Sequence, residues 1–156
     1  MDARVLRLLL NLYPPYLGAG IRVRRMDPDL RAVDVQMRLR WFNRNWVGTH
    51  FGGNLYSMVD PFYMLMLIHN LGPDYVVWDK AATIVFEKPG RGPVSASFRL
   101  DEATVRRIRA EADTGAKVLP RFDAVILDRT GDVVARVEKR LYVRRKARAD
   151  GGATAA

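Results

Sequence analysis

Residues 43–72, NRNWVGTHFGGNLYSMVDPFYMLMLIHNLG, decide the fold of this chain. Between residues 55 and 71 the apolar side chains occupy every face of an α-helix. A helix that is hydrophobic all round has to be covered all round by other parts of the protein. We therefore predict a buried central helix over about residues 53–71, enclosed by a strongly curved sheet to which the segments on either side contribute.

Neither hydrophobic segment of the chain has the pattern of a membrane-directed sequence. The central stretch is shorter than the roughly 20 apolar residues that span a bilayer, and Asp60, Pro61 and His69 interrupt it. Near the N-terminus, Arg7 interrupts the leucine run of a would-be signal peptide, and two prolines precede its small residues. We predict a short amphipathic helix at residues 2–13 instead, a cytoplasmic protein, and no membrane partner.

The segments that flank the central stretch have the alternating pattern of strands. Val33, Val35 and Met37 alternate with polar residues, which is typical of a strand with one buried face. The same pattern, bounded by turn residues, predicts strands at residues 21–26, 33–41, 75–88, 94–100, 117–128 and 133–145. Asp101 is a suitable N-cap for a second helix over residues 102–114. The predicted fold is therefore α+β with an antiparallel sheet.

Length and composition fit one domain without a nucleic-acid site. The chain has 156 residues and 49% hydrophobic content, enough for a single core, which we place at residues 1–148 ahead of a flexible tail at 149–156. Its net charge of +9 arises from 26 basic and 17 acidic residues. The arginines are spread over strands and one helix, and no nucleic-acid-binding motif accompanies them. The absence of cysteine excludes disulfides and thiolate catalysis.

The order of these elements, with NWVGTHFGG before the buried helix and FEKPGRGPVSASFRL after it, resembles the hotdog-fold thioesterase superfamily. The chain is most similar to the phenylacetic-acid-degradation type of acyl-CoA thioesterase and to an uncharacterised branch beside it. Those enzymes carry an Asn, a His-Gly-Gly and an Asp at set spacings. The matching Asn, glycine and Asp positions hold Asn45, Gly52, Gly53 and Asp60. Phe51 replaces the histidine, and His50 lies one place earlier.

The resemblance implies a homodimeric or homotetrameric hotdog protein, in which a curved antiparallel sheet wraps around a long central helix. It implies hydrolysis of an acyl thioester with acyl-CoA as substrate. Coenzyme A would enter as part of the substrate, and neither a cofactor nor a metal is expected. The site would lie at a dimer interface, where Asp60 of one subunit faces Gly53 of the other. The residues expected to contact substrate are Ser57, His50, and, for the phosphates of coenzyme A, Lys88 and Arg91.

The chemistry of the motif residues agrees with this expectation. Amide groups of Gly52 and Gly53 at the start of the central helix would suit a carbonyl oxygen that becomes an oxyanion. Asp60 is flanked by apolar residues, and partial desolvation would raise its pKa toward the range of a general base for water. Asn45 could orient that water or the carbonyl, and Ser57, one turn before Asp60, could hydrogen-bond the carboxylate.

Simpler interpretations of the same residues stay open. Asp60 followed by Pro61 is a good start for a helix, with aspartate as N-cap and proline in the first position. The match to the motif favours instead a central helix kinked at Pro61. Lys88 and Arg91 are also ordinary solvated turn residues. The missing histidine at Phe51 favours an alternative function, a hotdog protein that binds acyl-CoA or another acyl ligand without turning it over. A third function is that of a dehydratase or hydratase, which would need a paired histidine and aspartate.

Overall fold

The computed structural model describes residues 2–147, so the flexible tail predicted at 149–156 lies outside the described residues. The helices are α1 (Ala3–Leu12), α2 (Pro14–Ala19), α3 (Gly52–Ser57), α4 (Phe62–Leu71) and α5 (Glu102–Asp113). The strands are β1 (Ile21–Met26), β2 (Ala32–Met37), β3 (Tyr75–Phe86), β4 (Val94–Arg99), β5 (Arg121–Asp128) and β6 (Val133–Arg145). Every predicted strand is present, in the predicted α+β arrangement.

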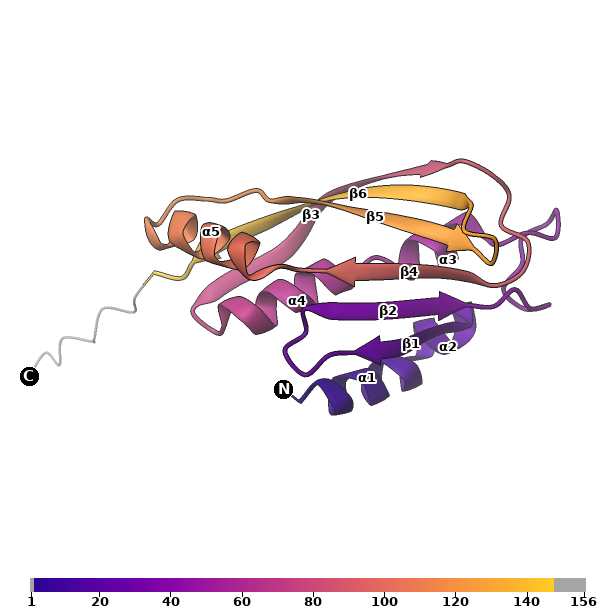
Figure 1. Cartoon of the computed structure of the whole chain (residues 1–156), viewed down its shortest axis with the longest axis horizontal. Coiled ribbons are helices and arrows are strands. Elements are labelled where there is room, and N and C mark those ends of the chain that lie inside the picture. The colour runs from indigo at the N-terminus through magenta and orange to yellow at the C-terminus, as the bar shows by residue number, and fades with distance from the viewer. Residues whose placement is uncertain (1, 148–156) are drawn as a thin grey trace, which may run out of the picture.

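The six strands form one antiparallel sheet in the order β1-β2-β4-β5-β6-β3. The sheet curves around α4, and α1 and α2 lie beside β1 (Figure 1). β4 shows how the sequence builds two faces, because Val94, Ala96 and Phe98 are buried while the residues between them are exposed. A strand places alternate residues on opposite faces, so the apolar half of β4 is turned to the core.

α4 supplies the centre of the core. Phe62, Met66 and Leu67 have no exposed surface, and the Phe62 ring packs on Phe98 of β4 with the ring centroids 4.8 Å apart. On another side of the helix, the Ile68 side chain is 43% exposed to solvent. A single chain therefore covers α4 only in part, although the helix is apolar on all sides.

The central helix predicted over about residues 53–71 is interrupted. A turn separates α3 from α4. Pro61 explains this break, since proline has no N–H to donate and its ring clashes with the carbonyl one turn earlier. The amide of Asp60 still donates to the Tyr56 carbonyl at 3.0 Å, so the turn keeps part of its helical hydrogen bonding. Pro61 itself is the N-cap of α4, which argues against the alternative in which Asp60 caps the helix.

The N-terminal segment forms two short helices where one was predicted at residues 2–13. The prolines begin α2 as well as ending α1, since proline is well suited to the first turn of a helix. Asn11 fastens α1 to the sheet, because its side chain both donates to the carbonyl and accepts from the amide of Val23. No helix within residues 2–147 is long and apolar enough to cross a membrane.

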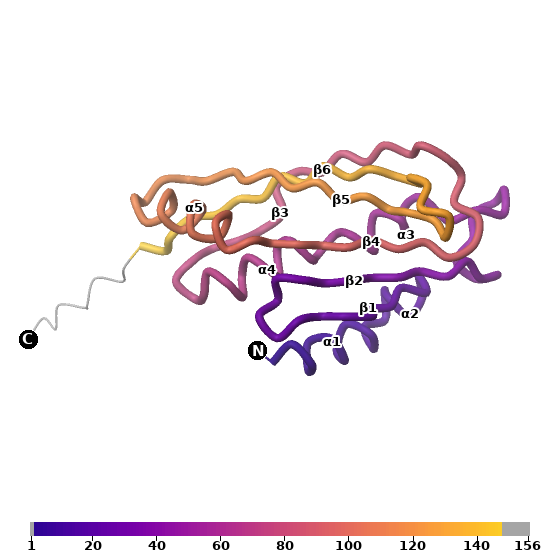
Figure 2. Tube along the Cα trace, in the orientation of Figure 1, coloured from indigo at the N-terminus to yellow at the C-terminus, as the bar shows by residue number. Residues whose placement is uncertain are grey.

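The segments that follow β2 and β3 turn back at the same end of the molecule (Figure 2). β2 ends at Met37 rather than at 41, and β3 ends at Phe86 rather than at 88. The two connecting segments meet where the amide of His50 donates to the carbonyl of Gly90 at 3.0 Å. This end of the fold therefore brings together the two halves of the sequence motif.

Candidate active site

Asp60 lies in the turn between α3 and α4 and faces a buried lysine of β6. Lys139 has no exposed surface. Its Nζ lies 3.0 Å from Oδ1 of Asp60 and 2.9 Å from Oδ1 of Asp79 on β3. The same ammonium donates to the backbone carbonyl of Asp60. One cation of β6 therefore joins two carboxylates that come from two other segments.

The burial of Lys139 follows from the alternation of β6. Val137 and Leu141, two places to either side, point into the core, and a strand places every second residue on the same face. Lysine is almost never fully buried unless it is paired. Neither Lys139 nor its partner Asp79 is among the predicted site residues, although a lysine in the middle of an apolar stripe was a usable signal for the first of them.

Tyr56, Tyr16 and Asp79 also lie near the Asp60 carboxylate. Burial, and next the Asp60 carboxylate, raise the pKa of the Tyr56 hydroxyl, so this group remains protonated at neutral pH. Lys139 Nζ lies 5.6 Å from the centre of the Tyr56 ring. Burial also raises the pKa of Asp79, against the opposing effect of Lys139. Because 45% of the Asp60 side chain is exposed, its carboxylate is held on one side and open on the other.

Gly52 and Gly53 begin α3, where backbone amides have no intrahelical partner. Aromatic rings approach both glycines closely. A Cβ on Gly52 would come within 2.9 Å of the Phe86 ring, and one on Gly53 would come within 2.5 Å of the Phe51 ring. A side chain at either position would therefore displace an aromatic ring, and the ring that covers Gly53 belongs to Phe51, the residue in place of the motif histidine.

The side chain of Asn45 forms hydrogen bonds within its own loop. Its Nδ2 donates to Oγ1 of Thr49 at 2.9 Å, and its Oδ1 accepts from the Thr49 amide at 3.0 Å and from the Val47 amide at 3.1 Å. These bonds occupy the side-chain amide that was expected to orient water or the substrate carbonyl. In the structure, Asn45 shapes the loop that precedes α3.

His50 joins that loop to the turn after β3. It is 3% exposed, and its Nε2 lies 2.7 Å from the carbonyl oxygen of Gly92. Burial lowers the pKa of the imidazole, against the effect of this hydrogen bond, so the ring is neutral at pH 7. A neutral ring that bonds a carbonyl carries its proton on Nε2. His50 is thus a fixed link between two segments of the site.

We expect stability to fall as the pH is lowered through the range of histidine titration. Because the folded-state pKa of His50 lies below the unfolded value of about 6.5, its contribution is complete above that value and is lost as the pH falls. One group gives a slope of at most about 1.4 kcal/mol per pH unit. Urea unfolding at several pH values measures the slope. His50→Gln should flatten this slope, whereas His69→Gln, at an exposed position, should leave it unchanged. A slope that persists in His50→Gln but disappears in His69→Gln would contradict the assignment of the slope to His50.

Lys88 is already paired. Its Nζ lies 2.7 Å from the carboxylates of both Asp128 and Asp132, and these two partners raise the pKa of the ammonium. Its charge therefore joins the turn after β3 to the β5–β6 turn, and the expected contact with a phosphate would compete with two carboxylates. Arg91, the other residue expected at the phosphates, is exposed in the same turn.

A cavity of about 410 Å³ opens beside α3. Its lining comprises Asn45, Thr49, His50, Gly52, Leu55, Phe86, Glu87, Lys88, Pro89 and Gly90. Asp60 does not line this cavity. The Ser57 hydroxyl was predicted to bond the Asp60 carboxylate, but it donates to the carbonyl of Gly53 at 2.8 Å. The structure thus brings four of the predicted site residues together in one protomer and leaves the predicted base outside them.

Solved structures match this fold over nearly the whole chain. A protein of unknown function from Pseudomonas aeruginosa, described as "Probable Thioesterase", gives a TM-score of 0.82 at 21% identity, over 94% of this chain and 97% of that one. A thioesterase from Haemophilus influenzae gives 0.68 at 12% identity, over 97% and 96%. The phenylacetic acid degradation protein PaaI from Thermus thermophilus, solved as a mutant, gives 0.57 at 19% identity, over 84% and 98%. No curated protein matches the sequence.

The chain is a hotdog-fold protein, as the sequence resemblance implied, with a six-stranded antiparallel sheet curved around a central helical segment. It belongs to the family described as a domain of unknown function (DUF4442), whose model matches residues 2–143. A fold does not by itself define a reaction, so the activity has to be argued from the site.

Proposed function

We propose that the protein hydrolyses an acyl thioester, with acyl-CoA as substrate and Asp60 as the general base. The observation that carries the proposal is the partly exposed Asp60 carboxylate held against the fully buried Lys139. The Lys139 ammonium fixes one oxygen of this carboxylate by a hydrogen bond, and the exposed part of the side chain is open to water. The descriptions of the P. aeruginosa and H. influenzae structures support the same class of reaction.

In the proposed reaction Asp60 takes a proton from water while the water oxygen attacks the thioester carbonyl carbon. The carbonyl oxygen becomes an oxyanion, for which the amides of Gly52 and Gly53 are the candidate donors. Collapse of the tetrahedral intermediate breaks the C–S bond, and the proton held by Asp60 passes to the leaving sulfur. The products are a carboxylic acid and coenzyme A, and the balance requires no cofactor.

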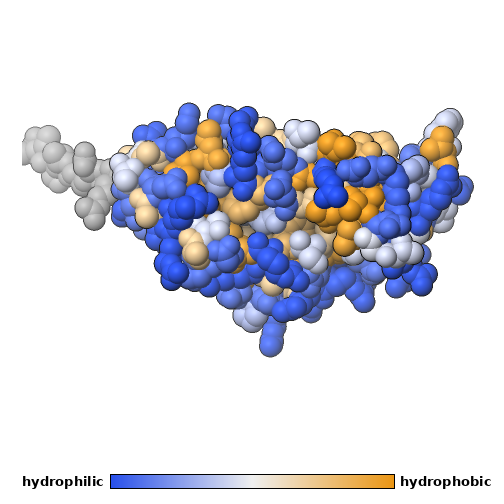
Figure 3. All heavy atoms as spheres, turned by 45° about the horizontal axis from the view of Figure 1, so that its top comes forward, coloured by the Kyte–Doolittle hydropathy of each residue, from blue (hydrophilic) through white to orange (hydrophobic). Residues whose placement is uncertain are grey.

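We propose that a second copy of the chain completes this site across β3, so that Gly53 of one subunit faces Asp60 of the other. β3 is an edge strand paired with β6 alone, and Val85 and Phe86 at its end are 52% and 54% exposed. Figure 3, which turns the top of Figure 1 toward the reader, shows a mainly hydrophilic surface with a group of hydrophobic residues toward the right of the view. An exposed apolar edge is a ready template for pairing with another chain.

The double variant Ala82→Glu/Val85→Glu should convert a dimer into a folded monomer, because charges on an edge strand oppose pairing. Sedimentation of the wild-type protein and the variant measures the mass of each. Ser95→Glu is the matched control, since Ser95 is exposed on β4, inside the sheet and away from either edge. A monomeric wild-type protein, or a variant that remains dimeric, would contradict the pairing across β3.

Thiol release from a panel of short, long and aromatic acyl-CoAs tests the proposed reaction. Turnover of any member would support hydrolysis and would define the acyl group. The alternative function, binding of an acyl ligand without turnover, is favoured by the Phe51 ring over Gly53, where the motif has histidine. A silent panel, together with saturable binding of acyl-CoA by the folded protein, would select that alternative.

A further inference from the structure

A hollow of about 360 Å³ lies where α2, β1 and the segment after β2 meet. None of its lining residues is acidic. The basic residues in the lining are Arg22, Arg24, Arg38 and Arg40. Arg22 and Arg24 are the exposed residues that alternate with buried Ile21 and Val23 on β1, and Gln36 on β2 lies opposite Arg22. The hollow is therefore an arginine-lined concavity that shares no lining residue with the cavity beside α3, and its Tyr16 lies near the Asp60 carboxylate.

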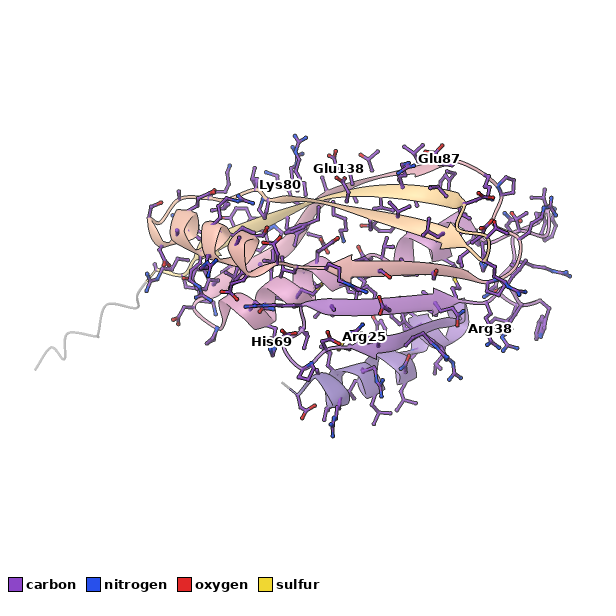
Figure 4. All side chains as sticks on the ribbon, in the orientation of Figure 1. Arg25, Arg38, His69, Lys80, Glu87 and Glu138 are labelled. Carbon is purple, nitrogen blue, oxygen red and sulfur yellow. The ribbon has the colours of Figure 1, made fainter. Side chains whose placement is uncertain are left out.

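The charges of this arginine group are uncompensated. Within residues 2–147, none of the group forms an ion pair. At the other end of the same strands, Asp34 pairs with Arg99 at 2.8 Å and with Arg25 at 4.0 Å. Arg25 and Arg38 lie at these opposite ends of the β1–β2 pair (Figure 4). Asp34 thus pairs with Arg25 and Arg99, whereas the four arginines of the hollow have no carboxylate partner within residues 2–147, and an anion would relieve their repulsion.

A buried asparagine holds the arginine-bearing segment in place. Asn43 is 2% exposed; its Nδ2 donates to the carbonyls of Ala19 at 2.7 Å and Arg38 at 2.8 Å, and its Oδ1 accepts from the Arg40 amide at 2.7 Å. A Cβ on Gly20 would lie 2.6 Å from Asn43 Nδ2, and its φ of +74° also favours glycine. The backbone that carries these arginines is therefore fixed before any ligand arrives, which lowers the entropy cost of binding.

We propose that this hollow binds a phosphate-bearing ligand. Guanidinium groups bind phosphate through two parallel hydrogen bonds, and several arginines that line one concavity favour a phosphate or diphosphate over a single carboxylate. The volume lies near the lower end of the roughly 300–1,000 Å³ of ligand pockets, which suits a head group. Leu17 and Phe42, both exposed, line the same hollow and offer contact to an apolar part of the ligand.

Two sources supply this chemistry: a soluble phosphoester, such as the nucleotide part of a coenzyme, or the head group of a phospholipid. The proposal does not require Asp60, so its test is independent of the test of thioester hydrolysis. Calorimetric titration of the full chain with pyrophosphate and with ADP probes the soluble source. Sedimentation with vesicles of phosphatidylglycerol, against vesicles of phosphatidylcholine, probes the lipid source.

Arg22→Gln/Arg38→Gln should weaken binding of the effective probe by about tenfold or more, since hydrogen bonds to charged groups are strong. Arg121→Gln/Arg136→Gln removes the same net charge from exposed arginines of β5 and β6 and should leave binding within about twofold. Binding to either source with this difference supports the site. Equal weakening in both variants would show that binding depends only on net charge and would contradict a site at the hollow. No binding to any probe would also overturn the proposal.

Discussion

Asp60→Asn should remove nearly all thioesterase activity, with kcat/KM lower by about 10²- to 10⁴-fold, the usual contribution of a general base. The amide has the size of the carboxylate but cannot take a proton from water. Because Asp60 is 45% exposed and an amide oxygen can still accept from Lys139, the fold should be retained. Thiol release by the wild-type protein and the variant, on an acyl-CoA that the panel identifies, measures the ratio.

Asp74→Asn is the matched control for this experiment. Asp74 is exposed and lies just before β3, and the same change of charge there should leave kcat/KM unaltered. Urea unfolding of both variants checks that each is folded. Turnover by Asp60→Asn close to the wild-type rate would remove Asp60 from the chemistry and leave it as a structural partner of Lys139.

We expect Lys139→Met to lower the free energy of unfolding by about 3 kcal/mol, because removing one partner of a buried ion pair leaves its counter-charges uncompensated. This is the low end of the usual range, since the side chains of Asp60 and Asp79 are 45% and 23% exposed. Methionine occupies a similar volume without a charge, so the loss reports the ion pairs rather than a cavity. Urea unfolding at neutral pH measures it.

Adding Asp79→Asn to Lys139→Met should recover part of the lost stability, because one of the unpaired carboxylates is then removed; the double-mutant cycle gives the coupling between the two residues. Lys80 provides the control, since it follows Asp79 but is exposed and lies at the upper surface of the sheet (Figure 4). Lys80→Met should change stability by no more than about 0.5 kcal/mol. Equal losses at Lys80 and Lys139 would contradict the buried ion-pair cluster.

The secondary structure was largely predictable, because its signals are local. β1 has the predicted bounds, and α5 begins after the predicted cap, with the Asp101 carboxylate accepting from the Thr104 amide at 2.7 Å. The break in the central helix has a local cause too, at Pro61. Pro61 was recognised as a disturbance, but whether it bends a helix or divides it depends on the packing around the turn.

The candidate site was predictable only as a set of residues. Asn45, His50, Gly52 and Lys88 do line one cavity, yet their hydrogen bonds and ion pairs differ from those expected. The Lys88 ammonium meets its carboxylate partners from the β5–β6 turn, and the Asn45 amide is taken by its own loop. Partners of this kind depend on which segments lie side by side, which a motif does not record.

The α+β class, the strands and the place of the central helical segment follow from local signals, because hydrophobic periodicity, caps and turn residues act within a few positions of the chain. Three features depend on tertiary packing: Lys139 joins Asp60 to Asp79, Asn43 holds the segment that lines the arginine-lined hollow, and β3 lies at an edge of the sheet. These contacts join distant parts of the chain, and they are selected by burial and by sheet order, which emerge only when the whole chain packs.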